Sequence, residues 1–135
     1  MATYQVVYKN HCTPQEQIKS GGRFYLDSDC RRKLTGTASV TVSGAPGDTD
    51  SDVGTYSSST SVSTSAVQIA ATGSDFIYVK NTGTDSVDLL LALDNALWYT
   101  VLSDGEAFAS KITTTADVRV KTASGTTTIE YLRLT

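Results

Sequence analysis

The sequence predicts an all-β protein, an antiparallel β-sandwich of jelly-roll type with about eight strands. Serine and threonine make up more than a quarter of the 135 residues, and threonine favours strands whereas serine favours turns. Short segments of alternating apolar and polar residues recur at regular intervals between turn signals, which is typical of a sandwich. A chain of this length is expected to form one domain, residues 1–135, around a single core.

The central stretch, Ser74 to Leu102, carries much of the bulky apolar side-chain surface. We predict three consecutive strands joined by tight turns, over Phe76–Lys80, Val87–Leu93 and Leu97–Leu102. The residue types in Asn81-Thr82-Gly83 tolerate positive φ and indicate a hairpin turn after the first strand. Apolar residues on both faces of the second strand place it in the centre of a sandwich or under a partner subunit.

The rest of the chain is expected to add short strands and two less regular segments. Residues 1–22 are predicted to form an extended N-terminal segment, with at most one helical turn over Pro14–Lys19, because proline is accepted at a first helical position. Gly44–Thr60 consists mostly of Gly, Pro, Ser, Thr and Asp, so we expect a long flexible loop. Strands are predicted at Thr3–Lys9 (a sheet edge or an arm that reaches a neighbour), Arg23–Leu26, Lys33–Ser43, Ser61–Ala70, Ala107–Ile112, Asp117–Thr122 and Thr128–Thr135.

The last two of these strands carry a clear pattern. Asp117–Thr122 alternates cleanly, with Val118 and Val120 predicted inward and Arg119 and Lys121 outward. With the turn residues that follow it, this segment and the terminal strand are expected to form a final antiparallel pair.

The charge and hydropathy patterns argue against two partner classes. A formal net charge of −3 and a single basic cluster, Arg31-Arg32-Lys33, do not favour a nucleic-acid surface. The first ten residues, MATYQVVYKN, lack the features of a secretory signal. No apolar run approaches the roughly 20 residues needed to span a bilayer, so no membrane partner is expected.

The sequence holds few metal ligands. Cys12 and Cys30 are too few for a disulfide framework, and with the single His11 they complete a zinc site only if distant carboxylates help. Two reduced thiols are favoured, and a disulfide is the alternative in an oxidising setting. No cofactor is expected.

Three acidic residues offer a weak calcium candidate. Asp48, Asp50 and Asp52 are spaced like the first ligands of a calcium-binding loop. The positions where that pattern requires Gly and Glu hold Val53 and Ser59, so a solvated acidic loop is favoured.

Catalysis is not expected. His11 and Cys12 are neighbours in sequence and cannot face each other across a cleft, and no Gly-x-Ser-x-Gly nucleophile motif occurs. Asp and Glu are scattered through the loops, where the simplest interpretation is solvation.

Five aromatic residues are the interaction candidates. Tyr4 and Tyr8 lie in the N-terminal segment, which is predicted to pack at an edge or to reach a neighbour. Tyr56, Trp98 and Tyr99 are the residues on which a carbohydrate-binding module would stack a sugar. For Trp98, a place in the core or at a subunit interface is favoured, because it lies in the most apolar part of the chain.

From Ser65 onward a succession of motifs covers about half of the chain. The motifs are Phe76-Ile77-Tyr78-Val79-Lys80, Asn81-Thr82-Gly83-Thr84, the apolar strand after it, Leu102-Ser103-Asp104-Gly105-Glu106, Val118-Arg119-Val120-Lys121, Gly125-Thr126-Thr127 and the terminal strand. This succession resembles the small β-sandwich structural proteins of tailed bacteriophage virions, which include head decoration, neck and tail-associated proteins.

This resemblance implies a capsid decoration (cement) protein, made in the host cytoplasm and located in the virion, that stabilises the head. It further implies a homotrimer whose partner is the major capsid protein or another virion protein. A neck or tail protein is the nearest alternative, and a carbohydrate-binding receptor-recognition module is an alternative of another class.

Overall fold

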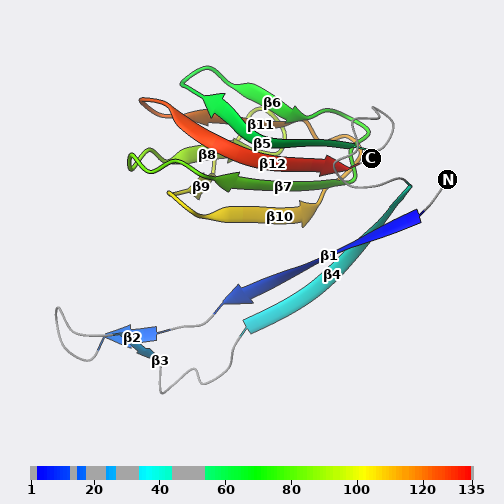
Figure 1. Ribbon diagram of the computed structural model, residues 1–135, viewed down its shortest axis with the longest axis horizontal. Coiled ribbons are helices and arrows are strands. Elements are labelled where there is room, and N and C mark those ends of the chain that lie inside the picture. The colour runs from blue at the N-terminus through cyan, green and yellow to red at the C-terminus, as the bar shows by residue number, and fades with distance from the viewer. Residues whose placement is uncertain (1–2, 13–14, 18–23, 27–33, 44–53, 135) are drawn as a thin grey trace. The chain divides into compact units, whose positions relative to one another are not determined.

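The computed structural model describes residues 3–12, 15–17, 24–26, 34–43 and 54–134, and every regular element in these ranges is a β-strand. No helix with the length and apolar character needed to cross a membrane occurs in this described part. The strands shown in Figure 1 are β1 (Thr3–Cys12), β2 (Gln15–Gln17), β3 (Phe24–Leu26), β4 (Leu34–Ser43), β5 (Gly54–Val62), β6 (Val67–Ala70), β7 (Phe76–Asn81), β8 (Leu89–Ala92), β9 (Thr100–Leu102), β10 (Ala107–Lys111), β11 (Val118–Thr122) and β12 (Thr127–Leu134).

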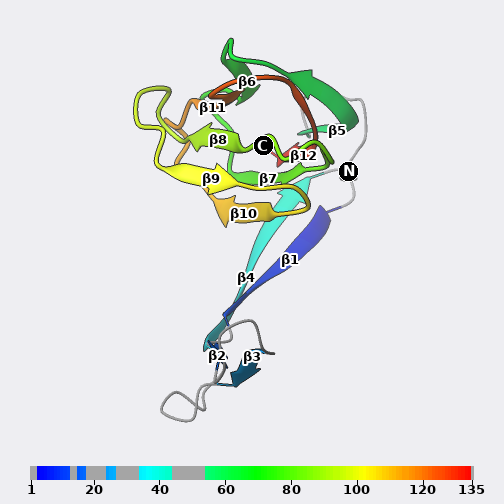
Figure 2. The same cartoon turned by 90° about the vertical axis from the view of Figure 1, so that its left-hand side faces the viewer.

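Strands β5 to β12 form two antiparallel sheets of four strands each, in the orders β10-β7-β12-β5 and β6-β11-β8-β9. Among these eight strands the first pairs with the last, β5 with β12, and the pairs β6 with β11, β7 with β10 and β8 with β9 nest inside it. This nested pairing is the jelly-roll arrangement. Figure 2 shows the two sheets as opposite layers. The predicted antiparallel sandwich is therefore confirmed.

Alternate residues of the two sheets meet in one hydrophobic core. Ile77 and Val79 of β7 and Val118 and Val120 of β11 are fully buried, as the period of two along a strand requires. Burying each such side chain contributes about 1.5–3 kcal/mol. The remaining members of the core are Val62, Ile69, Ala70, Leu89, Leu91, Leu102 and Ile129.

Asn81, the last residue of β7, is a fully buried polar residue whose side chain joins four segments. Its Nδ2 donates to the carbonyl oxygens of Val87 and Leu102, each at 2.9 Å. Its Oδ1 accepts from the Gly83 N–H at 3.1 Å and from Thr127 Oγ1 at 2.7 Å. Because both side-chain atoms are satisfied, the amide stabilises the point where β7, β8, β9 and β12 approach one another.

The backbone of Asn81 is held in the same place by the turn after β9. Its N–H donates to the Glu106 carbonyl at 2.9 Å, and its carbonyl accepts from the Gly105 N–H at 2.8 Å. The motifs at 81–84 and 102–106, which are distant in sequence, are thus adjacent in the fold. Gly83 fits closely here, since an added Cβ would overlap Thr127 Oγ1.

The N-terminal strands form two further sheets of two strands each. Strands β1 and β4 make a two-stranded sheet, and β2 pairs antiparallel with β3. The chain divides into two compact units. One comprises residues 7–39, and the other comprises residues 1–6 and 40–135. The predicted strands Thr3–Lys9, Arg23–Leu26 and Lys33–Ser43 correspond to β1, β3 and β4.

The predicted meander is wrong at its first turn. β7 lies in one sheet, whereas β8 and β9 pair in the other, so the connection after Asn81 crosses between sheets. In the described residues, positive φ occurs at Ser86 and Asn95 and at three glycines, but not at Asn81 or Gly83. The buried Asn81 side chain joins the two sheets and does not form a hairpin turn.

The predicted final pair is wrong for the same kind of reason. β11 pairs with β6 and β8, whereas β12 pairs with β5 and β7 in the opposite sheet. The turn between them is a connection between layers, since jelly-roll pairing joins strands that are far apart in sequence.

The predicted loop at Gly44–Thr60 is wrong for its second part. Residues 54–62 form β5, which pairs with β12 at seven positions, and residues 44–53 lie outside the described residues. β5 is an edge strand of its sheet, where serine and threonine are tolerated on the solvated side. The predicted strand Ser61–Ala70 is divided between the end of β5 and β6.

The prediction of at most one helical turn over Pro14–Lys19 is also wrong for the residues of this range that the structure describes. Gln15–Gln17 is β2, and each of its residues pairs with one residue of β3. Pairing with a neighbouring strand has overridden a weak local helix signal.

Candidate functional site

The aromatic candidates of the sandwich lie at two separate places. Tyr56 is in β5, at one edge of its sheet, and 48% of it is exposed. Trp98 and Tyr99 immediately precede β9, at the opposite edge of the other sheet (Figure 2). The three residues therefore do not form a single aromatic surface.

The N-terminal candidates lie in or near β1. Tyr4 and Tyr8 are residues of this strand, and Tyr8 is half-buried. His11 and Cys12 are its last two residues. Cys30 and the calcium candidates Asp48, Asp50 and Asp52 lie outside the described residues. Within the ranges that are described, no group of three or more His, Cys, Asp or Glu side chains is arranged to hold a metal ion.

Four exposed apolar residues lie in β9 and in the connection that precedes it. Leu93 is 40% exposed, Leu97 52%, Tyr99 83% and Val101 48%. Val101 pairs across the sheet with Leu90 of β8, which is half-buried. We call Leu93, Leu97, Tyr99 and Val101 the β9 surface. Large apolar side chains exposed along an edge strand and its connection are candidates for contact with another molecule.

Trp98 lies beside this surface and is half-buried. The Lys121 ammonium nitrogen lies 4.4 Å from the centroid of its ring, which is a cation–π contact. Lys121 belongs to β11 and pairs with Leu90 of β8. The contact fixes the indole across the outer face of the sheet and leaves Tyr99 as the more exposed aromatic residue.

A second cluster lies on the outer face of the other sheet. The Tyr56 hydroxyl donates to Glu130 Oε2 at 2.9 Å, and the Tyr78 hydroxyl donates to Glu130 Oε1 at 3.0 Å. Tyr56 and Tyr78 both pair with Leu132 of the intervening strand β12, so the two phenols flank that strand. We call Tyr56, Tyr78 and Glu130 the tyrosine–glutamate cluster.

This cluster raises the pKa of both phenols. For Tyr56 the hydrogen bond to the Glu130 carboxylate is the main cause, and for Tyr78 burial is the main cause, followed by the same carboxylate. Loss of a phenol proton would place a second negative charge beside Glu130. The neutral phenols are therefore favoured in the folded state.

The pKa shifts predict alkaline instability. A folded-state pKa above the unfolded value of 10.0 gives stability that is complete below that pH and is lost as pH rises through the raised pKa values. Urea unfolding measured from neutral to strongly alkaline pH should therefore show a falling midpoint that begins near the ordinary tyrosine pKa. Glu130→Gln should make this fall shallower, since it removes the carboxylate from both phenols.

Tyr56→Phe is the matched variant, because it removes one of the two phenols and leaves the carboxylate in place. It should likewise make the alkaline fall shallower. An identical slope in Glu130→Gln and in the unmodified protein would contradict the assignment.

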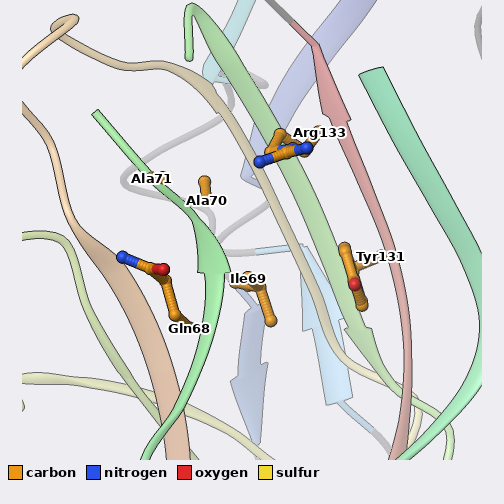
Figure 3. A pocket seen from close by; sticks show the side chains of 6 residues that line it. All are labelled: Gln68, Ile69, Ala70, Ala71, Tyr131 and Arg133. Atoms are coloured by element: carbon orange, nitrogen blue, oxygen red, sulfur yellow. The ribbon is translucent and has the colours of Figure 1, made fainter. Parts of the chain in front are cut away.

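Cavities lie at several places on the surface of the described sandwich, among them one of about 180 Å³ lined by Ser86, Val87, Asp88, Ala123 and Ser124. One of about 130 Å³ is lined by β6 and the residue after it and by β12, namely Gln68, Ile69, Ala70, Ala71, Tyr131 and Arg133 (Figure 3). A larger one of about 380 Å³ lies between the β8–β9 and β10–β11 connections and is here called the end cavity. Its lining residues are Leu93, Asp94, Lys111, Ile112, Thr113, Thr115 and Ala116.

Sequence reasoning missed Glu130, Tyr78 and the end cavity. Glu130 alternates with Ile129 and Tyr131 along β12, which places it on the outer face, but nothing local indicates two tyrosine partners. Asp94 and Thr115 come from connections whose proximity depends on the pairing of strands. The only sequence signal that could have pointed to the end cavity was the clustering of polar residues at turns.

The described residues thus offer exposed apolar side chains along β9, the tyrosine–glutamate cluster and one cation–π contact. Comparisons of the chain with protein-family models, curated proteins and solved structures found no match.

Proposed function

We propose that this protein is a structural component of a tailed bacteriophage virion, a capsid decoration protein that stabilises the head. The observation that carries the proposal is the β9 surface, in which Tyr99 is 83% and Leu97 52% exposed. Exposed apolar residues along one sheet edge leave apolar surface in water, and contact with a partner would cover it.

Two further observations support the proposal. The motifs of the phage resemblance at 81–84 and 102–106 are adjacent in the fold and hydrogen-bonded through Asn81. These hydrogen bonds make the scaffold rigid. A particle that repeats one interface by symmetry needs rigid subunits. The jelly-roll fold occurs in proteins of many functions, so it is compatible with this proposal but does not by itself support it.

In this proposal the β9 surface makes the contact between copies in a homotrimer, and the major capsid protein is the partner of the assembled trimer. A neck or tail protein would use the same surface against a different virion partner. Tyr99 and Val101 are the expected centre of the contact, because an exposed aromatic residue flanked by aliphatic residues is a common interface anchor.

The expected result in solution is a trimer that depends on the β9 surface. The double variant Tyr99→Ser with Val101→Ser should weaken self-association by about tenfold or more, as two central apolar contacts are lost. Sedimentation velocity over a concentration series measures this. Tyr56→Ser, an aromatic change at the opposite edge, should leave association unchanged.

Cosedimentation with purified virion parts then separates the alternatives. Binding to expanded heads supports the decoration role, and binding to tails or necks supports the nearest variant. A protein that stays monomeric and binds neither part contradicts the proposal.

A second candidate, receptor recognition through a glycan, is favoured by Tyr99, which is 83% exposed and follows Trp98 in the sequence. Tyr56 would not take part, because it lies at the far edge of the other sheet.

A further inference from the structure

The end cavity has the size of a small-molecule site. Its volume of about 380 Å³ falls within the range of roughly 300–1,000 Å³ that is usual for ligand pockets. It lies between two connections that bring residues from opposite sheets together, since β8 and β9 belong to one sheet and β10 to the other.

The backbone around the cavity is held by hydrogen bonds on both sides. The Asp117 N–H donates to the Leu93 carbonyl at 3.1 Å, which joins the two connections. The Gly73 N–H donates to the Thr114 carbonyl at 2.6 Å, and the Ala116 N–H donates to the Thr113 carbonyl at 2.9 Å. The lining residues are therefore positioned before any ligand arrives.

Asp94 supplies an oriented acceptor. Its Oδ1 accepts from the backbone N–H groups of Ala96 and Leu97, each at 2.9 Å, and the residue is exposed. These two N–H groups hold the pKa of the Asp94 carboxyl below its usual range, so the carboxylate stays ionised. An ionised carboxylate accepts hydrogen bonds and donates none.

Thr113 and Thr115 supply hydroxyls that both donate and accept. Their Oγ1 atoms lie 3.1 Å apart, and both residues are exposed. Of the apolar lining residues, Ile112 and Ala116 are half-buried and pack against the core, and Leu93 is 40% exposed. The lining thus combines apolar and hydrogen-bonding side chains.

We propose that the end cavity binds a polyhydroxylated ligand, a sugar ring whose hydroxyls meet Asp94, Thr113 and Thr115 and whose C–H face packs on Leu93, Ile112 and Ala116. A ring with a polar edge and an apolar face matches both parts of the lining. The lining carries one acidic and one basic residue, Asp94 and Lys111, so its charges favour neither an anion nor a cation. The proposal does not depend on the virion assignment, although Leu93 also belongs to the β9 surface.

The test is a titration of the whole chain, labelled with ¹⁵N, with D-glucose, D-galactose and D-mannose up to about 50 mM, a range suited to weak binding. At least one hexose should shift the amide signals of Ala96, Leu97 and residues 113–116. Thr115→Val keeps the shape and removes one hydroxyl, so affinity should fall roughly fivefold to twentyfold. Asp94→Asn retains an acceptor for the backbone but removes the charge, and it should also weaken binding.

Thr84→Val is the control, since it alters an exposed threonine outside the cavity and should bind like the unmodified chain. The ¹⁵N spectrum of each variant reports directly whether it is folded. Absence of shifts with all three hexoses overturns the proposal. Shifts centred on Trp98 and Tyr99, or binding that Thr115→Val and Asp94→Asn leave unchanged, overturn it as well, and the former would support glycan recognition by the aromatic residues.

Discussion

Replacement of Asn81 by leucine is expected to lower the free energy of unfolding by about 3–5 kcal/mol, because buried polar groups lose their partners while the volume is nearly kept. The groups left without Asn81 are the carbonyls of Val87 and Leu102, the Gly83 N–H and the Thr127 hydroxyl. Chemical denaturation followed by tryptophan fluorescence measures the loss.

The neighbouring residue provides the control. Thr82 is exposed, and its hydroxyl donates to Thr128 Oγ1 at 3.2 Å. Thr82→Val should change the free energy of unfolding by less than about 0.5 kcal/mol. A loss below about 1 kcal/mol for Asn81→Leu would mean that the amide does not join the sheets as described.

Truncation of Ile129 to alanine is the second large change. This side chain is fully buried in the core, and its strand β12 is paired on both sides, with β5 and β7. Because neighbours paired on both sides cannot collapse into the space, we expect a loss of about 3–4 kcal/mol in the free energy of unfolding.

A graded series makes this prediction specific. Ile129→Val removes one methylene group and should cost about 0.5–1.5 kcal/mol. Equilibrium urea unfolding of both variants gives the comparison. Equal losses for the valine and alanine variants would indicate that the core repacks, which contradicts the close fit inferred for β12.

The positions of most strands were predictable from local alternation. In β11, Val118 and Val120 are fully buried while Arg119 and Lys121 are half-exposed, as the pattern of two predicts. In β8, apolar residues on both faces indicated a central strand, and β8 lies between β11 and β9. The alternation of apolar and polar residues along one strand depends only on the order of residues in the chain, so the sequence shows it directly.

The pairing of strands was not predictable in the same way. A turn signal such as Asn81-Thr82-Gly83 fits a hairpin and a connection between sheets equally well, and only the partner strands distinguish the two. β5 was missed because its serines and threonines resemble a loop until β12 is available to pair with it. Tyr56 of β5 and its hydrogen-bond partner Glu130 are 74 positions apart in the sequence.

The candidate site was predictable only by residue type. Trp98 and Tyr99 were identified from the sequence, and their different exposure follows from Lys121, a residue of another strand. Asp94, Thr113 and Thr115 carry no motif, because their meeting depends on connections at the ends of both sheets.

The pairing of β5 with β12 has a consequence for biosynthesis. β12 leaves the ribosome after the other seven strands of the sandwich, yet it occupies an interior position of its sheet, between β7 and β5. Until it emerges, β5 and β7 have no shared neighbour and the nascent chain exposes strand edges that invite aggregation. Completion of the sandwich must therefore wait until β12 has emerged.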